Sequence, residues 1–249
     1  LRTRRQRQMC IRDRIHSHFL TPHMLRVTLG GPEMASFPKD QESAYVKLIF
    51  PQPVDGHSLT RTYTISEQRQ HEIDVDFALH GEQGVASNWA INAQPGNRIL
   101  VGGPGPRKLI HMDADWFLLA GDMTALPAIK VNLAQLPPDA RGYVVLKIVD
   151  ESDIQPLDAP PGIEVHWVVN ASADISGSTL LKRIERLTWL PGQPAVWAAC
   201  EFHSMRALRK HFKQLCQWPK GFLYVSSYWK IGSTEDQHKI AKRDDAQAA

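Results

Sequence analysis

The residues of this chain best suited to chemistry are four consecutive ones in a β-rich segment, Arg-Thr-Tyr-Thr at positions 61–64. The guanidinium of Arg61 offers a rigid fork of N–H donors that suits a phosphate. Tyr63 lies on the same strand face as Arg61 and can stack on an aromatic ring system. The hydroxyl of Thr64 can hydrogen-bond a ring nitrogen. The pattern favours binding of a phosphate and an aromatic ring. The alternative is a β-branched strand with an exposed arginine.

A second candidate site follows at residues 80–89, His-Gly-Glu-Gln-Gly-Val-Ala-Ser-Asn-Trp. Two glycines at the start of a helix can form a phosphate cradle from backbone N–H groups and the helix dipole. Ser87 adds a hydroxyl to that cradle. The alternative is an ordinary strand-to-helix turn with Ser87 as the N-cap. The functional interpretation gains support because a phosphate-binding arginine and a phosphate-binding turn occur in one small domain.

The elements that must position these residues form an all-β first half. Short β-rich segments with turn residues between them occupy 24–29, 45–50, 62–65, 73–79 and 98–101, and a helix begins near 84–87. Residues 73–79 alternate apolar and polar side chains, which is typical of a half-buried strand. Strands at this spacing predict an antiparallel β-barrel.

The second half has a different pattern, in which apolar strands alternate with helices. The strands are expected at 117–120, 144–149, 165–169, 195–199 and 222–225. This alternation predicts a doubly wound α/β domain with a mostly parallel sheet covered on both faces. Ligands bind such sheets beyond the carboxyl ends of the strands, here near 120–122 and 200–201. We therefore predict a barrel at 15–112, an α/β domain at 113–234 and a charged C-terminal tail at 235–249.

The formal charge of +3 comes from the first fourteen residues. Residues 1–14 hold six arginines and one aspartate, so the remaining chain carries a net charge of −2. This segment is a basic arm, a disordered tail or residues foreign to the protein, and we favour the last and exclude 1–14 from the fold. The body of the chain has no basic excess, so we expect no nucleic-acid partner.

Composition and cysteine usage predict a cytoplasmic protein. No apolar run is long enough to cross a bilayer and no secretion signal is present, so no membrane association is expected. Three cysteines without a Cys-x-x-Cys pair predict neither a disulfide framework nor a zinc or iron–sulfur site. His16 and His18 share a strand face but have no further ligands near them in sequence, so we expect no metal site.

Several longer motifs occur in order along the chain. Besides 61–64 they are Asp-Phe-Ala-Leu-His-Gly at 76–81, Gly-Val-Ala-Ser-Asn-Trp-Ala at 84–90, Gly-Pro-Gly at 103–105, Ala-Gly-Asp-Met-Thr-Ala-Leu-Pro-Ala at 120–128 and Ser-Tyr-Trp-Lys-Ile-Gly at 227–232. Together they resemble the siderophore-interacting proteins, which are FAD-containing ferric-siderophore reductases of bacteria. The resemblance covers about residues 15–235 and implies a ferredoxin–NADP reductase-like architecture.

The resemblance also implies roles for individual residues. The residues expected to bind the FAD phosphate and isoalloxazine are Arg61, Tyr63 and Thr64. The residues expected to line the flavin are Asp76, Phe77, Ala78 and His80. The residues expected on the pyrophosphate and adenine side are Gly84, Ala86, Ser87 and Trp89. Thr124 is expected to close over the flavin from the second domain. Val85 stands where the family usually has proline, and Cys200 stands where it usually has glycine. Cys200 is interpreted as a buried inert thiol, with a redox role as the alternative.

The activity implied is electron transfer from NADH or NADPH through FAD to a ferric siderophore, which releases Fe(II). Because ferric catecholates are anionic, a positive pocket is expected, and Lys47 and Lys230 match the family positions for it. A choice between NADH and NADPH is expected to depend on Arg206, Arg209 and Lys210. The alternatives are a reductase linked to ferredoxin or another carrier, and a flavin-binding sensor without turnover. A monomer is expected.

Overall fold

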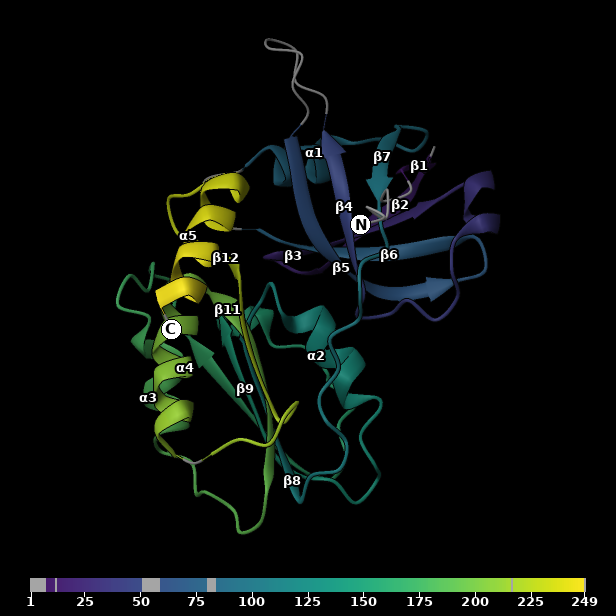
Figure 1. Cartoon of the computed structure of the whole chain (residues 1–249). Coiled ribbons are helices and arrows are strands. Elements are labelled where there is room, and N and C mark those ends of the chain that lie inside the picture. Colours follow the sequence, from purple (N-terminus) through teal and green to yellow (C-terminus); the bar gives the residue numbers. More distant parts are fainter. Residues whose placement is uncertain (1–7, 12, 51–58, 80–83, 216, 249) are drawn as a thin grey trace, which may run out of the picture. The chain divides into compact units, whose positions relative to one another are not determined.

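The computed structural model describes residues 8–11, 13–50, 59–79, 84–215 and 217–248 (Figure 1). Contacts between residues divide the chain into two compact units, Leu1–Lys108 and Leu109–Ala249. The division lies shortly before the sequence-based boundary at 112.

The first unit is built from antiparallel strands. Its elements are β1 (Gln8–Ile11), β2 (Asp13–Thr21), β3 (Met24–Gly30), the 3-10 helix η1 (Pro32–Ser36), β4 (Tyr45–Phe50), β5 (Leu59–Arg69), β6 (Glu72–Ala78), α1 (Val85–Asn92) and β7 (Ile99–Gly102). The strands hydrogen-bond in the order β1-β7-β4-β5-β6-β3-β2, with every neighbouring pair antiparallel. This arrangement confirms the predicted antiparallel barrel.

Alternation of side chains explains the core of this barrel. In β4 every second residue, Val46, Leu48 and Phe50, is buried, and the residues between them are only half-buried. Val27 and Leu29 of β3 join the same apolar cluster. Because successive side chains of a strand point to opposite faces, this pattern gives β4 one face in the core and one face outside it.

The N-terminal segment differs from its prediction in one respect. Residues 1–14 were expected outside the fold, but β1 pairs with β7 in the register Gln8↔Gly102 to Ile11↔Ile99. The physical reason is that β7 is otherwise an edge strand, whose outer backbone groups can take a partner. Residues 1–7 and 12 lie outside the described part of the chain.

The second unit contains a parallel sheet with helices on both faces. Its elements are β8 (Trp116–Asp122), α2 (Leu126–Leu133), β9 (Arg141–Ile148), the 3-10 helix η2 (Glu151–Asp153), β10 (Gly162–Val169), α3 (Ser178–Ile184), β11 (Pro194–Glu201), α4 (Phe202–Leu215), β12 (Leu223–Trp229) and α5 (Glu235–Ala248). The strand order is β10-β9-β8-β11-β12 and all pairs are parallel. The predicted doubly wound α/β fold is therefore confirmed.

Both faces of this sheet are covered, so its central strands β8 and β11 are buried along their whole length. All seven residues of β8 and all eight of β11 are buried. Helices α3 and α4 cover one face and α2 the other (Figure 1). Gly121 permits close packing here, because a Cβ at this position would lie 2.7 Å from the Cβ of Ala125 and 2.7 Å from the carbonyl oxygen of Ala199.

Candidate functional site

The geometry of the first candidate site is set by one strand that changes partner. β5 pairs with β4 from Leu59↔Phe50 to Thr64↔Tyr45, and with β6 from Ile65↔Val75 to Arg69↔Glu72. Within the described residues, 76–78 of β6 therefore pair with β3 alone. Segments 61–64 and 76–78, which sequence analysis selected separately, flank the point at which β5 and β6 part. Backbone N–H and C=O groups that lack a strand neighbour need other partners, so a polar ligand suits this gap.

Three aromatic side chains connect the two segments to helix α1. The ring of Tyr63 lies 4.3 Å from that of Phe77, and the ring of Phe77 lies 6.1 Å from that of Trp89, centroid to centroid. Phe77 is fully buried, whereas Tyr63 and Trp89 keep part of their surface exposed. The structure therefore brings the three predicted residues together. It leaves Phe77 only its backbone with which to contact a ligand.

Asp76 has a partner that sequence analysis did not identify. Its carboxylate accepts hydrogen bonds from Nε and Nη2 of Arg26, at 2.7 and 2.9 Å. The hydrogen bond that Arg26 donates to Asp76 is the main cause that raises the pKa of Arg26, against the effect of burial. Because this pair is cross-strand, on β3 and β6, the side chain of Asp76 stabilises the barrel. Its backbone remains at the gap beside β5.

Arg61 and Tyr63 lie on the inner face of the β4–β5 ribbon at this gap. They stand opposite the buried side chains of Leu48 and Val46, respectively, and both remain half-exposed. One N–H group of Arg61 donates to the carbonyl oxygen of Thr60 at 2.9 Å. This bond holds the guanidinium near its own strand and leaves the fork geometry suited to a phosphate.

Helix α1 supplies the second phosphate-binding element. Its N-cap is Gly84, so the alternative in which Ser87 is the N-cap is wrong. No side chain caps this helix among the described residues, and a Cβ on Gly84 would meet no atom within 4 Å. The amide groups of the first turn, with the half-buried Ser87 at its third position, are therefore open to an anion. Ala86 is buried, and His80 lies outside the described residues.

The arrangement in the first unit fits an FAD cofactor. An arginine fork and an uncapped helix N-terminus suit the pyrophosphate. The Tyr63 ring suits a flat ring system, and the backbone beside Ala78, which has no partner strand on the β5 side among the described residues, suits the polar edge of such a ring. Thr64 and Lys47 lie on the outer face of the β4–β5 ribbon. Alternate residues of a strand point to opposite faces, and Arg61 and Tyr63 occupy the inner face. Thr64 pairs with Tyr45 in the register and is half-buried.

In the second unit a buried carboxylate joins three strand ends. Oδ2 of Asp122 accepts hydrogen bonds from the backbone N–H of Glu201 at 2.8 Å and from the indole N–H of Trp229 at 2.9 Å. Oδ1 accepts from both the backbone N–H and the hydroxyl of Thr124. Asp122 thus fixes the carboxyl ends of β8, β11 and β12, which form the ligand-binding edge expected of this fold. The role of Thr124 toward a flavin stays a prediction.

Glu201 continues this network as the cap of α4. Its Oε2 accepts from the backbone N–H groups of His203 and Ser204, at 2.5 and 3.3 Å, and its Oε1 accepts from that of Ile231 at 3.2 Å. The carboxylate is fully buried. A negative group at a helix N-terminus is stabilised by the unpaired amides of the first turn. Glu201 therefore orders the start of α4 and the segment after β12 together.

The surroundings of Cys200 indicate a structural role for its side chain. Its side chain is fully buried in the apolar cluster beneath α3 and α4, and burial raises the pKa of its thiol well above the usual range. The Cβ that replaces the family's usual glycine therefore points into the core. A buried, protonated thiol is a poor nucleophile, which favours the inert interpretation.

We expect Cys200→Ala to lower the free energy of unfolding by about 1 kcal/mol and to change electron-transfer rates by less than about twofold. Thiol titration in a C10S/C216S background checks the same point: Cys200 should react only after unfolding. A thiol that reacts in the native protein, or a large loss of turnover in Cys200→Ala, would support the redox interpretation instead.

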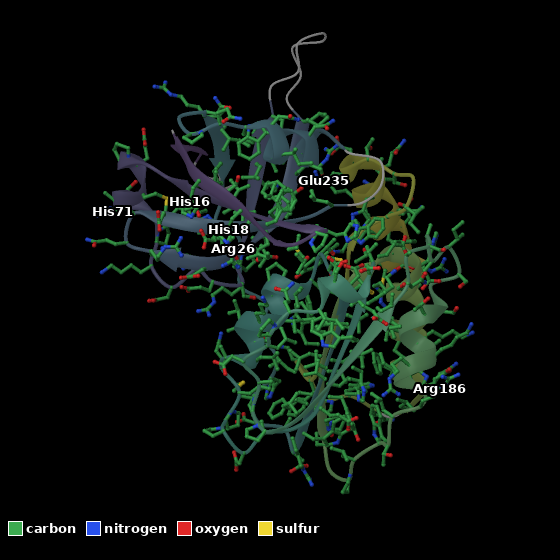
Figure 2. All side chains as sticks on the ribbon, turned by 180° about the vertical axis from the view of Figure 1, so that it is seen from behind. His16, His18, Arg26, His71, Arg186 and Glu235 are labelled. Atoms are coloured by element: carbon green, nitrogen blue, oxygen red, sulfur yellow. The ribbon has the colours of Figure 1, made fainter. Side chains whose placement is uncertain are left out.

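The remaining predicted residues lie at separate places. Lys230 follows β12, and its ammonium lies 5.0 Å from the centre of the Phe202 ring. Arg206, Arg209 and Lys210 all lie on α4. His16 and His18 stack on β2 with ring centroids 6.0 Å apart (Figure 2). Within the described residues no group of three or more His, Cys, Asp or Glu side chains could hold a metal ion, and no helix is long and apolar enough to span a membrane.

Three features of the structure were not predicted from the sequence: the contact of Arg26 with Asp76, the linking role of Asp122, and the position of Asp245 on α5. Asp122 stood within a recognised motif, but its bond to Trp229 joins residues 107 positions apart. The signal that could have found Arg26 is the run of alternating acidic residues 74 and 76, which requires a cationic neighbour when one face is buried. Sequence alone does not provide the register that identifies that neighbour.

The chain matches family models over both units. Residues 114–232 match the model described as siderophore-interacting protein, and residues 14–58 and 52–108 match the siderophore-interacting FAD-binding domain. Among curated proteins it is similar to the ferric vibriobactin reductase ViuB of Vibrio cholerae, with 31% identity over 248 residues and 91% of each chain covered.

Two solved structures have the same fold along nearly the whole chain. The siderophore-interacting protein SipS from Aeromonas hydrophila has a TM-score of 0.86 at 29% identity, over 97% of this chain and 99% of that one. A siderophore utilization protein from T. fusca has a TM-score of 0.79 at 30% identity, over 93% and 96%.

Proposed function

Because the chain belongs to the siderophore-interacting protein family, we propose that it is an FAD-dependent reductase that takes electrons from NADH or NADPH and reduces ferric siderophores. One NAD(P)H supplies two electrons, so each reduces two ferric chelates to Fe(II) and leaves NAD(P)⁺ and a proton. Oxygen-donor chelators hold Fe(II) less firmly than Fe(III), so reduction releases the metal. Iron is the substrate here and needs no protein ligand.

The observation that best supports this proposal is the parting of β5 and β6 beside Arg61 and Tyr63. It provides backbone without a partner strand on the β5 side among the described residues, a phosphate-binding fork and an aromatic face within one domain, and these features suit FAD. Bound FAD supplies the conversion of a two-electron donor into two one-electron transfers. Arg61 and the first turn of α1 would hold its phosphates, Tyr63 would orient its ring, and the backbone of residues 76–78 would offer polar groups to that ring.

The second unit contributes an ordered nucleotide-binding edge. Asp122 and Glu201 hold the ends of β8, β11 and β12 through hydrogen bonds that are buried or half-buried. Such an edge receives dinucleotides in open α/β sheets, which supports a nicotinamide donor. The function of Asp122 and Glu201 is to keep the backbone of this edge fixed, since each carboxylate already accepts several protein hydrogen bonds.

The absorbance spectrum of the purified protein, recorded before and after each donor under anaerobic conditions, tests the proposal. We expect a flavin spectrum that is bleached by NADH or NADPH and restored by a ferric catecholate, with Fe(II) trapped by a colour-forming chelator. Bleaching only by reduced ferredoxin would favour the carrier-linked alternative. Flavin that no donor reduces would favour a sensor, and a colourless protein that does not bind FAD would contradict the proposal.

We propose that Lys47 in the first unit and Lys230 in the second each attract the anionic ferric siderophore. We expect Lys47→Ala combined with Lys230→Ala to raise the half-saturating ferric-catecholate concentration roughly five- to tenfold, because two cationic side chains that attract an anion are lost. FAD content should not change. The matched control is Lys39→Ala with Lys220→Ala, which removes two exposed lysines from the same two units. If both double variants change the half-saturating ferric-catecholate concentration equally, the proposed role of Lys47 and Lys230 is refuted.

A further inference from the structure

A basic groove of about 530 Å³ lies on the second unit, where α4 and α5 approach the loop after β10. Four cationic side chains of α4 line it, Arg206, Arg209, Lys210 and Lys213. Ser176 contributes from the loop, and Asp245 contributes the sole carboxylate among the lining residues. The groove therefore suits an anion, and one of its own residues is an anion.

Asp245 engages two of the four cations directly. Its Oδ1 lies 3.1 Å from Nε of Arg206, and its Oδ2 accepts a hydrogen bond from Nη1 of Arg209. The side chain of Asp245 is 12% exposed and that of Arg209 22%, whereas Arg206 is 63% exposed. Two guanidiniums that bind one carboxylate form a site that also suits a phosphate. Asp245 therefore occupies the place that a phosphate would take.

The groove lies where an open α/β sheet binds nucleotides. Its two flanks follow the carboxyl ends of β10 and β11. The loop flank is fixed in two ways. Asp174 accepts from the backbone N–H groups of Ser178 and Thr179, and Gly177 has a φ of +66° and packs so closely on His203 that a Cβ would overlap its backbone. A ligand thus meets a preformed surface.

We propose that Asp245 sets the choice of reductant, favouring NADH over NADPH. This inference rests on the proposed use of a nicotinamide donor. The two donors differ by one phosphate on the adenosine ribose. In this groove the phosphate dianion of NADPH must either displace the carboxylate of Asp245 from Arg206 and Arg209 or lie next to that negative charge. The ribose hydroxyl of NADH has no charge, so it is not repelled by Asp245. Asp245 acts through the two arginines and is a positioning residue.

Removal of this charge need not release α5, because other contacts hold the helix. The hydroxyl of Ser227 on β12 lies 2.7 Å from Nε2 of His238, and this pair is buried. The ammonium of Lys242 donates to Ser226 Oγ at 2.8 Å and to the carbonyl oxygen of Ser227 at 3.1 Å. α5 begins at Glu235 (Figure 2), so these anchors span its middle turns. Asp245→Asn therefore tests charge rather than folding.

The experiment compares Asp245→Asn with Asp244→Asn in the FAD-loaded protein. The control removes the same charge one residue away, where the side chain is 61% exposed and outside the groove. Calorimetry with 2′,5′-ADP and with 5′-AMP reports binding without turnover, and kcat/KM for NADPH and NADH reports donor choice. We expect Asp245→Asn to tighten 2′,5′-ADP and to raise the NADPH/NADH ratio by about tenfold, with 5′-AMP changed less than about twofold. The gain should shrink with added salt.

A second variant keeps the test independent of any loss of folding. Arg206→Gln in the Asp245→Asn background should cancel most of the gain for 2′,5′-ADP. Equal behaviour of Asp245→Asn and Asp244→Asn, in a protein that NADH still reduces, would overturn this inference alone. A protein in which no variant is reduced by either nicotinamide would overturn the proposed donor and this inference together.

Discussion

Arg61→Ala is expected to yield largely flavin-free protein. The guanidinium lies at the parting of β5 and β6 and is the predicted partner of the FAD phosphate. A hydrogen bond to a charged group contributes about 1.5–3 kcal/mol, so FAD affinity should fall roughly 10- to 150-fold. Flavin absorbance per protein after purification, followed by fluorescence titration with FAD, measures the change.

The control for Arg61→Ala is Arg98→Ala, which removes an exposed arginine from the same unit. It should retain its flavin. Arg61→Lys should bind FAD with intermediate affinity, since lysine keeps the charge but loses the planar fork. Full FAD occupancy in Arg61→Ala would remove this residue from the site and weaken the assignment of the gap as the flavin-binding position.

Asp122→Ala is expected to destabilise the second unit while FAD stays bound to the first. The substitution leaves the N–H groups of Glu201, Trp229 and Thr124 without their acceptor at a buried edge. Unsatisfied buried donors cost about 1–3 kcal/mol each, so a loss of roughly 3 kcal/mol or more is expected. Reduction by NADH or NADPH should fall in parallel, because the strand ends that receive the donor lose their common anchor.

Thermal unfolding followed by tryptophan fluorescence measures the stability change, which we expect to lower the unfolding midpoint by about 10 °C. Asp113→Ala, at an exposed position in the same unit, serves as the control and should leave the midpoint within about 2 °C. An unchanged midpoint together with unchanged reduction by NADH would show that water or another group replaces Asp122, and would contradict its linking role.

Local pattern was enough to predict most elements of both units. Apolar runs such as 117–120 and 195–199 are buried strands. Residues 73–78 form β6 as predicted, but the strand is not half-buried: Asp74 and Asp76 are buried too, because they pair with Arg69 and Arg26. Hydrophobic periodicity reports burial, and burial decides secondary structure when both faces of a sheet are covered. β1 was missed because its pairing with β7 depends on an edge rather than on its own residues.

Side-chain partners were much harder to predict than elements. Phe77 was expected to line a flavin, and its ring is buried in contact with Tyr63 and Trp89, two neighbours that the sequence did not identify. Asp76 was selected for the same role, and its carboxylate binds Arg26, fifty positions away. Such partners depend on strand register, which composition and spacing do not determine.

α5 shows the same limit at the other end of the chain. Residues 235–249 were interpreted as a charged tail, either a short surface helix or a frayed end, and the structure shows the helix α5. Its attachment depends on a few polar pairs, among them Ser227 with His238 and Arg209 with Asp245. Polar contacts between distant segments leave no periodic trace in a sequence, so they emerge only from the fold.

The change of partner within β5 has a consequence for the cooperativity of the barrel. Among the described strands, β5 is the only hydrogen-bonded connection between the group β1-β7-β4 and the group β6-β3-β2. A cofactor held at that junction braces both groups at once, so its binding free energy adds to the resistance of the entire barrel against unfolding. We therefore expect the cofactor-free chain to be cleaved by proteases faster than the FAD-loaded chain.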